Sequence, residues 1–230
     1  MRRPRPVVAI DGPAGAGKST AARRLAERLG FVLVDTGALY RGVALAAHEA
    51  GVAWDDGPAL GALAARLDLS FSLGPGAVPR LHIDGVDRSA EIRTPHISDG
   101  ASKVSSQPEV RAALLDVQRA LGREGGVVLE GRDIGTVVFP DAELKVFLTA
   151  SAEERARRRH AELEARGVPS RYRDILAGMR ERDARDRGRA IAPLVPAADA
   201  VVLDSSDLDL EAVVERLAAL AARHIHAPVD

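Results

Sequence analysis

The sequence predicts an α/β fold: about five mostly parallel strands form one sheet with helices on both faces, and a small antiparallel hairpin region is inserted. Short apolar runs without polar alternation, at residues 7–10, 127–129 and 144–148, are typical of strands buried on both faces, and helical patterns separate them. Segment 67–92 instead has the short alternating pieces of an antiparallel hairpin. The chain has 230 residues, 46% of them hydrophobic, which is enough for the core of a single domain over 1–230.

The first elements along the chain are a strand, a glycine-rich loop and a helix. After the strand at 7–10, the loop runs from Gly12 to Gly17, and apolar residues then recur at helical spacing until Gly30. A second buried strand at 31–34 ends at Asp35, and a helix follows at 39–50. This alternation of strand and helix predicts a parallel sheet.

The remaining elements continue the pattern after the hairpin. The hairpin strands are expected at 69–73 and 81–83, with turns at 74–76 and 84–85. A helix opens at Pro108 and keeps one apolar face as far as Leu121. Further strands are expected at 127–129, 144–148 and 200–203, and further helices at 152–166, 171–187 and 210–222.

Composition excludes several classes of function. The 32 basic and 33 acidic side chains give a net charge of −1, so the totals predict no general attraction to nucleic acid or membranes. With no cysteine, the chain has no disulfide, zinc–cysteine site or cysteine nucleophile. The apolar run at 7–10 is too short for the core of a signal peptide, and no later stretch approaches a membrane span. A cytoplasmic enzyme fits these observations.

The distribution of cations is more informative than their sum. Only Lys18, Lys103 and Lys145 are lysines, so 29 of the 32 basic residues are arginines, and compositional bias explains most of them. Segment 151–189, however, holds 12 arginines against 8 acidic residues. Guanidinium groups bind phosphates through two hydrogen bonds at once, so we expect an anionic ligand near this segment.

The strongest chemical signal is the loop Gly12-Pro13-Ala14-Gly15-Ala16-Gly17-Lys18-Ser19, which satisfies the pattern G-x-x-x-x-G-K-[ST] between a strand and a helix. Glycines let backbone N–H groups surround phosphate oxygens, and the helix N-terminus adds partial positive charge. Lys18 would reach the terminal phosphates and Ser19 could bind Mg²⁺. The loop therefore predicts a polyphosphate site.

Among proteins with such a loop, a small kinase is the best class. The base-reading Asn-Lys-x-Asp and the Asp-x-x-Gly switch of regulatory GTPases do not occur. Residues 127–130 resemble the strand before the acidic metal partner of motor ATPases, but Gly131-Arg132-Asp133 follows, which is unusual for those motors. A kinase of a small alcohol, of the shikimate type, and a non-catalytic nucleotide-binding module remain as alternatives.

Four segments extend this interpretation to a family. They are Asp35-Thr36-Gly37-Ala38-Leu39-Tyr40-Arg41, Glu91-Ile92-Arg93, the run from Glu130-Gly131-Arg132-Asp133 to Pro140, and Arg182-Asp183-Ala184-Arg185-Asp186-Arg187 through Ala192-Pro193-Leu194. In this order the chain resembles the bacterial cytidylate kinases. The resemblance implies a P-loop kinase fold with a nucleotide-binding insert at 36–124 and a lid at 155–167. It implies phosphoryl transfer from ATP to CMP or dCMP with Mg²⁺, in a monomer that acts on small molecules.

The resemblance also implies which residues form the site. The ATP site would comprise Gly12, Pro13, Ala14, Gly15, Ala16, Gly17, Lys18, Ser19 and Thr20, with Ser19 as the Mg²⁺ ligand. The acceptor phosphate would be held by Thr36, Arg41, Arg132 and Arg189, cytosine by Ser102, Arg111 and Asp133, and the sugar by Arg182 and Asp186. The side chains expected to act in catalysis are Lys18, Arg41, Arg132, Arg189 and the lid residues Arg158 and Arg159.

Elementary chemistry agrees with these assignments. An acceptor phosphate is already ionised near pH 7, so transfer needs positioning and neutralisation of charge, and no general base. The six histidines are scattered without ligand or triad spacing, and none is expected to be catalytic. Two acidic residues keep a structural alternative. Asp35 could cap the helix that follows it, and Asp186 could pair with Arg182 one turn earlier.

Overall fold

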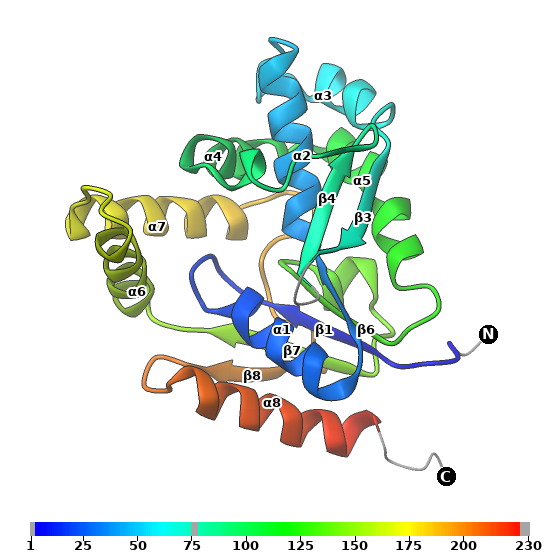
Figure 1. The fold of residues 1–230 in the computed structure, drawn as a ribbon, viewed down its shortest axis with the longest axis vertical. Helices are drawn as coiled ribbons and strands as arrows, with labels where there is room; N and C mark the ends of the chain where they lie inside the picture. Colours follow the sequence, from blue (N-terminus) through cyan, green and yellow to red (C-terminus); the bar gives the residue numbers. More distant parts are fainter. Residues whose placement is uncertain (1–2, 75–77, 226–230) are drawn as a thin grey trace. The chain divides into compact units, whose positions relative to one another are not determined.

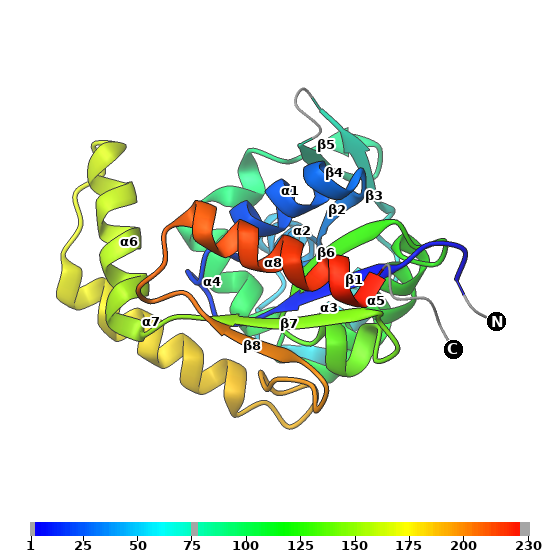
Figure 2. The same ribbon diagram turned by 90° about the horizontal axis from the view of Figure 1, so that it is seen from below.

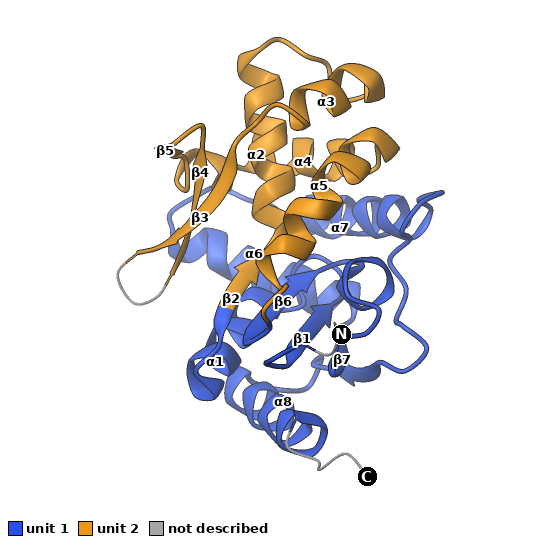
Figure 3. Ribbon diagram, turned by 90° about the vertical axis from the view of Figure 1, so that its right-hand side faces the viewer, with its two compact units in different colours: residues 1–32, 125–230 blue, residues 33–124 orange. Residues whose placement is uncertain are grey.

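The structure, a computed structural model, describes residues 3–74 and 78–225, which form two compact units (Figures 1 and 3). Unit 1 comprises residues 1–32 and 125–230, and unit 2 comprises residues 33–124. Residues 1 and 2 and most of the turn expected at 74–76 lie outside the described residues. None of the helices in the described ranges is both long and apolar enough to cross a membrane.

The larger sheet has five strands in the order β2-β6-β1-β7-β8. They are β1 (Val7–Asp11), β2 (Val32–Asp35), β6 (Val127–Gly131), β7 (Leu144–Thr149) and β8 (Val201–Asp204). The central strand β1 pairs in parallel with β6 and with β7, and β7 pairs in parallel with β8. Every residue of β1 and β6 is buried, which explains the apolar runs at 7–10 and 127–129 with which these strands begin. The predicted parallel sheet is confirmed.

Two helices of unit 1 pack together on this sheet. The helix α1 (Lys18–Leu29) follows the glycine-rich loop, and α8 (Leu210–Ile225) lies alongside it near the end of the chain (Figure 2). Leu25 of α1 and Leu217 of α8 are both fully buried. Two exposed ion pairs, Arg24 with Glu211 and Arg28 with Glu215, join the outer edges of the helices at 2.5 Å. Such exposed pairs contribute little, so apolar burial holds the helices in place.

The arginine-rich segment forms a helical hairpin in unit 1. It consists of α6 (Ala152–Ala165), which directly follows β7, and α7 (Tyr172–Arg187), which packs against it (Figure 1). The hydroxyl of Ser151 caps α6 by accepting a hydrogen bond from Glu154 N at 3.1 Å. Few residues of either helix are buried, and among those that are buried Arg155, Asp183 and Asp186 are charged.

Unit 2 combines four helices with a small antiparallel sheet. The helices are α2 (Thr36–Glu49), α3 (Gly57–Ala64), α4 (Pro95–Val104) and α5 (Pro108–Leu121), and a short helical turn, η2, spans Glu91–Arg93. The sheet has the order β3-β4-β5, with β3 (Leu69–Leu73), β4 (Pro79–Ile83) and β5 (Val86–Asp87). Asp84 and Gly85 turn between β4 and β5 with φ of 51° and 80°. Leu39, Leu60 and Leu114 are fully buried in the shared core.

The antiparallel hairpin is confirmed, but three details of unit 2 differ from the sequence prediction. The helix expected at 39–50 begins at Thr36, because Asp35 accepts a hydrogen bond from Ala38 N at 3.2 Å and so caps an earlier start. The strand β5 extends the hairpin to three strands. The helices α3 and α4 were not predicted, because their sequences are rich in glycine, proline and polar residues.

Candidate active site

The glycine-rich loop connects the carboxyl end of β1 to α1. Gly12 has a φ of 146°, and a Cβ atom there would lie 1.9 Å from the carbonyl oxygen of Leu148 on β7. Gly17, the N-cap of α1, has a φ of 85°, which favours glycine. The unsatisfied N–H groups of the first turn of α1 and its partial positive charge make this end of the helix suited to an anion. Ser19 and Thr20 lie exposed in that turn.

Lys18 is buried beside the loop that precedes it. Its side chain is 5% exposed, and its Nζ donates a hydrogen bond to the carbonyl oxygen of Pro13 at 2.8 Å. Burial, reinforced by the positive charge of Arg132, lowers the pKa of Lys18 to about 7. The surroundings of Lys18 therefore favour its neutral form, and a bound anion would favour the charged form.

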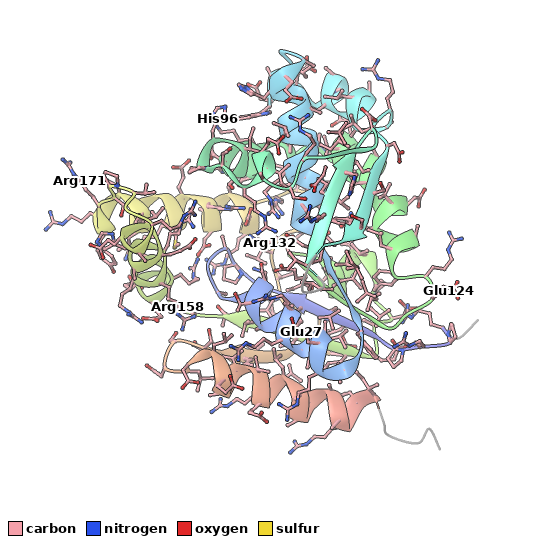
Figure 4. The ribbon with its side chains drawn as sticks, viewed as in Figure 1. Glu27, His96, Glu124, Arg132, Arg158 and Arg171 are labelled. Atoms are coloured by element: carbon pink, nitrogen blue, oxygen red, sulfur yellow. The ribbon has the colours of Figure 1, made fainter. Side chains whose placement is uncertain are left out.

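A buried carboxylate gathers arginines at the end of α7. Oδ2 of Asp186 accepts a hydrogen bond from Arg132 Nε at 3.2 Å, and Oδ1 accepts one from Arg189 Nη2 at 2.5 Å. Arg132 comes from the segment after β6 (Figure 4). Burial opposes ionisation of Asp186, but the positive charges of Arg132, Arg189 and Arg182 outweigh it and lower the pKa of this carboxyl. The structure thus brings these predicted acceptor residues together.

The pairing of Asp186 differs from the structural alternative considered above. Its hydrogen-bond partners are Arg132, from a distant part of the chain, and Arg189, three residues later. Arg182 contributes through its charge. A carboxylate that serves as a local helix partner would not need to be buried, whereas the side chain of Asp186 is 1% exposed. It organises the arginines of the site.

The three arginines of α6 that fall in the segment predicted as a lid have different surroundings. Arg158 of α6 donates from Nη2 to the carbonyl oxygen of Ser205 at 2.5 Å, and a Cβ atom on Gly17 would lie 4.0 Å from its Nη1 (Figure 4). Arg159 pairs with Glu162 on the same helix at 2.7 Å. Arg155 is buried and pairs with Asp183 of α7 at 2.5 Å, and its Nη1 donates to the carbonyl oxygen of Ala14 in the loop at 3.0 Å.

In unit 2, Arg41 is held against the start of its own helix. Its Nη2 pairs with Oδ2 of Asp35 at 2.5 Å, while Oδ1 of the same carboxylate caps the helix. The carboxylate of Asp35 therefore caps the helix, as the structural alternative expected, and also pairs with Arg41. A Cβ atom at Gly37 would lie 3.0 Å from Arg41 Nη1 and 3.1 Å from Asp35 Oδ1, so glycine leaves room for this arrangement. Thr36, beside it, is buried.

A second polar group in unit 2 joins α4 to α5. Ser102 is 2% exposed, and its Oγ has no hydrogen-bond partner among the described residues. The carbonyl oxygen of Ser102 accepts from Ser105 Oγ at 3.1 Å, and the carbonyl oxygen of Ser105 accepts from Arg111 Nη1 at 3.2 Å. The guanidinium of Arg111 lies 5.6 Å from the ring centre of Tyr40. A flat, cationic group with buried polar neighbours is suited to a planar polar ligand.

Sequence reasoning missed two buried carboxylates of unit 1. Asp183 neutralises Arg155, and Asp11, the last residue of β1, accepts two backbone hydrogen bonds from Ile134 and Gly135. Asp183 lies inside a segment of many charges, where the sequence gives no sign of burial. For Asp11 a signal existed, because an acidic residue directly ended an apolar strand.

Comparison with known proteins identifies the family. A family model described as cytidylate kinase matches residues 8–223. Relatives named cytidylate kinase include one from Pasteurella multocida, 48% identical, covering 95% of this chain and 96% of the relative. One from Syntrophotalea carbinolica is 50% identical, with 94% and 92% covered, and one from Pseudomonas aeruginosa PAO1 is 52% identical, with 92% and 93% covered.

A solved structure supports the fold alone. An uncharacterized protein from Eubacterium ventriosum aligns with a TM-score of 0.52 over 97% of this chain and 100% of its own, at 12% identity. The family model and the three relatives each cover at least nine-tenths of the chain, and the family model includes the glycine-rich loop and the arginines around Asp186. The chain therefore belongs to the cytidylate kinase family.

Proposed function

We propose that this protein transfers the γ-phosphoryl group of ATP to CMP or dCMP, which gives ADP and CDP or dCDP. The observation that carries the proposal is the convergence of Lys18, Arg132, Arg182 and Arg189 around the glycine-rich loop and the buried Asp186, in a chain of the cytidylate kinase family. These cations offset the negative charge of the donor triphosphate and of the acceptor monophosphate. Because the acceptor phosphate is already ionised near pH 7, the protein does not need to transfer a proton.

The reaction then follows from charge and position. A non-bridging oxygen of the acceptor phosphate attacks the γ-phosphorus of ATP, and the bond from that phosphorus to the β,γ-bridging oxygen breaks, so the electron pair leaves with ADP. Arg132 and Arg189 would orient the acceptor phosphate, because Asp186 already fixes both guanidinium groups. Positioning two reactants in this way can supply roughly 7–11 kcal/mol of the barrier reduction.

Lys18 would bind the terminal phosphates of the donor. Burial lowers the pKa of the free side chain to about 7, so the unbound lysine loses its charge more readily than an exposed one. A nearby triphosphate favours the charged form, so we expect the ammonium to be fully formed once ATP is bound. Charge placed by the protein where negative charge develops is a large contribution to catalysis. Arg41, Arg158 and Arg159 are proposed to add to it.

The residues present fit a magnesium ion bound mainly by substrate. Ser19 offers an exposed hydroxyl in the first turn of α1, beside the loop that would hold the phosphates. Across residues 3–74 and 78–225, no three His, Cys, Asp or Glu side chains gather as a metal site. Mg²⁺ typically uses one or two protein ligands together with phosphate oxygens and waters. When bound with ATP, the ion would screen charge on the β- and γ-phosphates.

The base and sugar contacts are also proposals. Ser102, Arg111 and Asp133 would read cytosine, and Arg182 and Asp186 would contact the sugar. The buried Oγ of Ser102, which lacks a hydrogen-bond partner among the described residues, supports a polar ligand at this position. The monomeric state, the cytoplasmic location and the absence of nucleic acid and membrane partners stay predictions.

Release of ADP with a panel of acceptors tests the proposal. CMP, dCMP, UMP, AMP and shikimate are each offered with Mg²⁺ and ATP, and an assay without acceptor measures background hydrolysis. We expect turnover with CMP or dCMP at least tenfold above every other acceptor. Turnover with shikimate would favour the alcohol kinase. Tight ATP binding with no turnover on any acceptor would favour the non-catalytic module, and either result overturns the proposal.

A further inference from the structure

Asp11 makes contacts that the proposed reaction does not use. It ends β1 and is 5% exposed, and both carboxylate oxygens are engaged. Oδ1 accepts a hydrogen bond from Ile134 N at 2.8 Å, and Oδ2 accepts one from Gly135 N at 2.7 Å. The donors open η3 (Ile134–Val138), a π-helical turn that follows β6. A carboxylate on one strand therefore anchors the turn after the neighbouring strand.

Burying the Asp11 carboxylate costs free energy of folding, which indicates that this side chain does more than fill space in the core. Burial raises the pKa of Asp11 to about 6, and the two backbone hydrogen bonds and the charge of Lys18 only partly compensate. The turn also sits tightly on its anchor. A Cβ atom at Gly135 would lie 3.2 Å from the Lys145 side chain and 3.4 Å from Asp11 Oδ2. An apolar residue at position 11 would avoid the cost but would leave two buried N–H groups unpaired.

The anchored turn fixes the residues directly before it. The backbone carbonyl of Asp133 accepts hydrogen bonds from Val137 N at 2.9 Å and from Val138 N at 3.2 Å. On the other side, Arg132 follows Gly131, the last residue of β6, which is paired with Asp11 itself in the sheet register. Arg132 and Asp133 therefore lie between a strand that is paired with β1 and a turn that is anchored by the Asp11 carboxylate.

We propose that Asp11 is a positioning residue for the acceptor nucleotide: its carboxylate sets the turn after β6 and thereby places Arg132 and Asp133 relative to the glycine-rich loop. The proposal rests on the acceptor roles given above to Arg132 and Asp133. It distinguishes Asp11 from a residue that only stabilises the sheet. If Asp11 only stabilised the sheet, its replacement would impair the use of ATP and of CMP alike. If it positions Arg132 and Asp133, its replacement should impair mainly the use of CMP.

The first test compares Asp11→Asn with Asp209→Asn. The amide retains the size of the carboxylate but presents an NH₂ group to one of the two N–H donors. Asp209 is a matched control, since it accepts a backbone hydrogen bond from Ala212 N at 2.8 Å in an exposed position. For Asp11→Asn we expect kcat/KM for CMP to fall about 10²-fold, with KM for ATP within about threefold of the parent. Equal losses for both substrates, or none, would overturn the proposal.

A second test uses the unmodified protein and decides the question if Asp11→Asn does not fold. The amide proton shifts of Ile134 and Gly135 are followed by NMR from pH 4 to 8. The charged groups that act on Asp11 are Lys18 of α1 and Asp133 after β6, and the methylene groups of Lys145 of β7 lie beside Gly135. We expect both amide protons to shift together with the Asp11 carboxyl resonance and to exchange slowly above its midpoint. Amides that do not sense this titration would refute the anchoring role.

Asp133→Asn and Arg132→Lys separate this inference from the proposed function. If both variants leave CMP kinetics unchanged, the acceptor site proposed above is wrong, and the positioning role falls with it. If they impair CMP and Asp11→Asn does not, the acceptor site holds and the positioning role alone is wrong. Impairment by all three, with KM for ATP preserved in Asp11→Asn, supports both.

Discussion

Replacing Asp183 by alanine should destabilise the helical hairpin and the loop it contacts. Asp183 of α7 binds Arg155 of α6 through both oxygens, at 2.5 and 3.1 Å, and the two side chains are 6% and 2% exposed. Arg155 also donates to the carbonyl oxygens of Ala150 and Ala14, each at 3.0 Å. One buried guanidinium therefore connects both helices with the glycine-rich loop.

The expected loss of stability depends on the charge that the substitution leaves without a partner. Asp183→Ala strands a buried guanidinium without its counter-ion, and we expect a loss of about 3–5 kcal/mol in the free energy of unfolding. Arg180→Ala is the matched control, because Arg180 and Glu153 join the same two helices at 2.6 Å with side chains 61% and 55% exposed. An exposed pair contributes about 0–1 kcal/mol. The two pairs differ mainly in burial.

Urea denaturation followed by far-UV circular dichroism measures both variants. A third variant, Arg155→Met with Asp183→Leu, should recover part of the loss, because it removes the uncompensated charge but leaves two carbonyls without their donor. We also expect Asp183→Ala to raise KM for ATP more than KM for CMP, since Arg155 contacts Ala14 in the loop. If Asp183→Ala costs no more than Arg180→Ala, the buried pair does not hold the hairpin, and the reasoning fails.

Four further predictions concern the reaction. Lys18→Ala should lower turnover by well over tenfold in a protein whose circular dichroism is unchanged, and a smaller drop would remove Lys18 from the phosphate site. Binding of ATP above pH 7 should take up protons, because Lys18 has a pKa of about 7 when free and gains a proton beside the triphosphate. Calorimetry in buffers of different ionisation enthalpy measures this uptake, and proton release would contradict the prediction. Hydrogen exchange at residues 155–167 should slow when a bisubstrate analogue binds, and unchanged exchange would argue against a closing lid. Asp133→Asn should reduce kcat/KM for CMP and leave or improve that for UMP, since an amide can donate to uracil O4; equal losses for both would make Asp133 a positioning residue.

The sequence was most informative where one short segment determines its own structure. The glycine-rich loop is such a segment, since its pattern places glycine at positions 12 and 17, which adopt positive φ. The buried strands are another, because burial on both faces leaves an uninterrupted apolar run. Together these two local patterns are sufficient to predict that the loop lies at the carboxyl end of β1.

The helices α3 and α4 were not predicted because they contain glycines that allow close packing against their neighbours. A Cβ atom at Gly61 of α3 would lie 2.5 Å from the Glu109 side chain of α5, and one at Gly100 of α4 would lie 2.5 Å from the Trp54 ring. These helices need glycine because their neighbours approach closely. In the sequence the same glycines resemble loop signals, since the contacts that justify them come from distant residues. The π-helical turn η3 was missed for a related reason, because its anchor lies on β1.

The arginines of the segment predicted as a lid show the limit of interpreting a motif residue by residue. Arg158 and Arg159 are adjacent, and Arg155 lies three residues before Arg158, so the sequence cannot tell which of them faces the protein. Successive helical residues differ by about 100° in direction. In the structure Arg155 faces inward to Asp183, while Arg159 pairs with Glu162 along the exposed side of α6. Only the packing of α7 on α6 separates these roles.

Charge balance around Asp186 explains why an acidic residue belongs in a site for phosphate. One carboxylate meets the charges of Arg132, Arg189 and Arg182, so the group keeps a positive excess that an anion can neutralise. Without the carboxylate, three guanidinium groups would repel one another, and their long side chains would have to be ordered by the substrate at the moment of binding. The negative charge of Asp186 weakens the attraction of the site for the acceptor phosphate, but it holds the arginines in position before the acceptor binds. In a reaction that needs no general base, fixed position is what the protein can contribute.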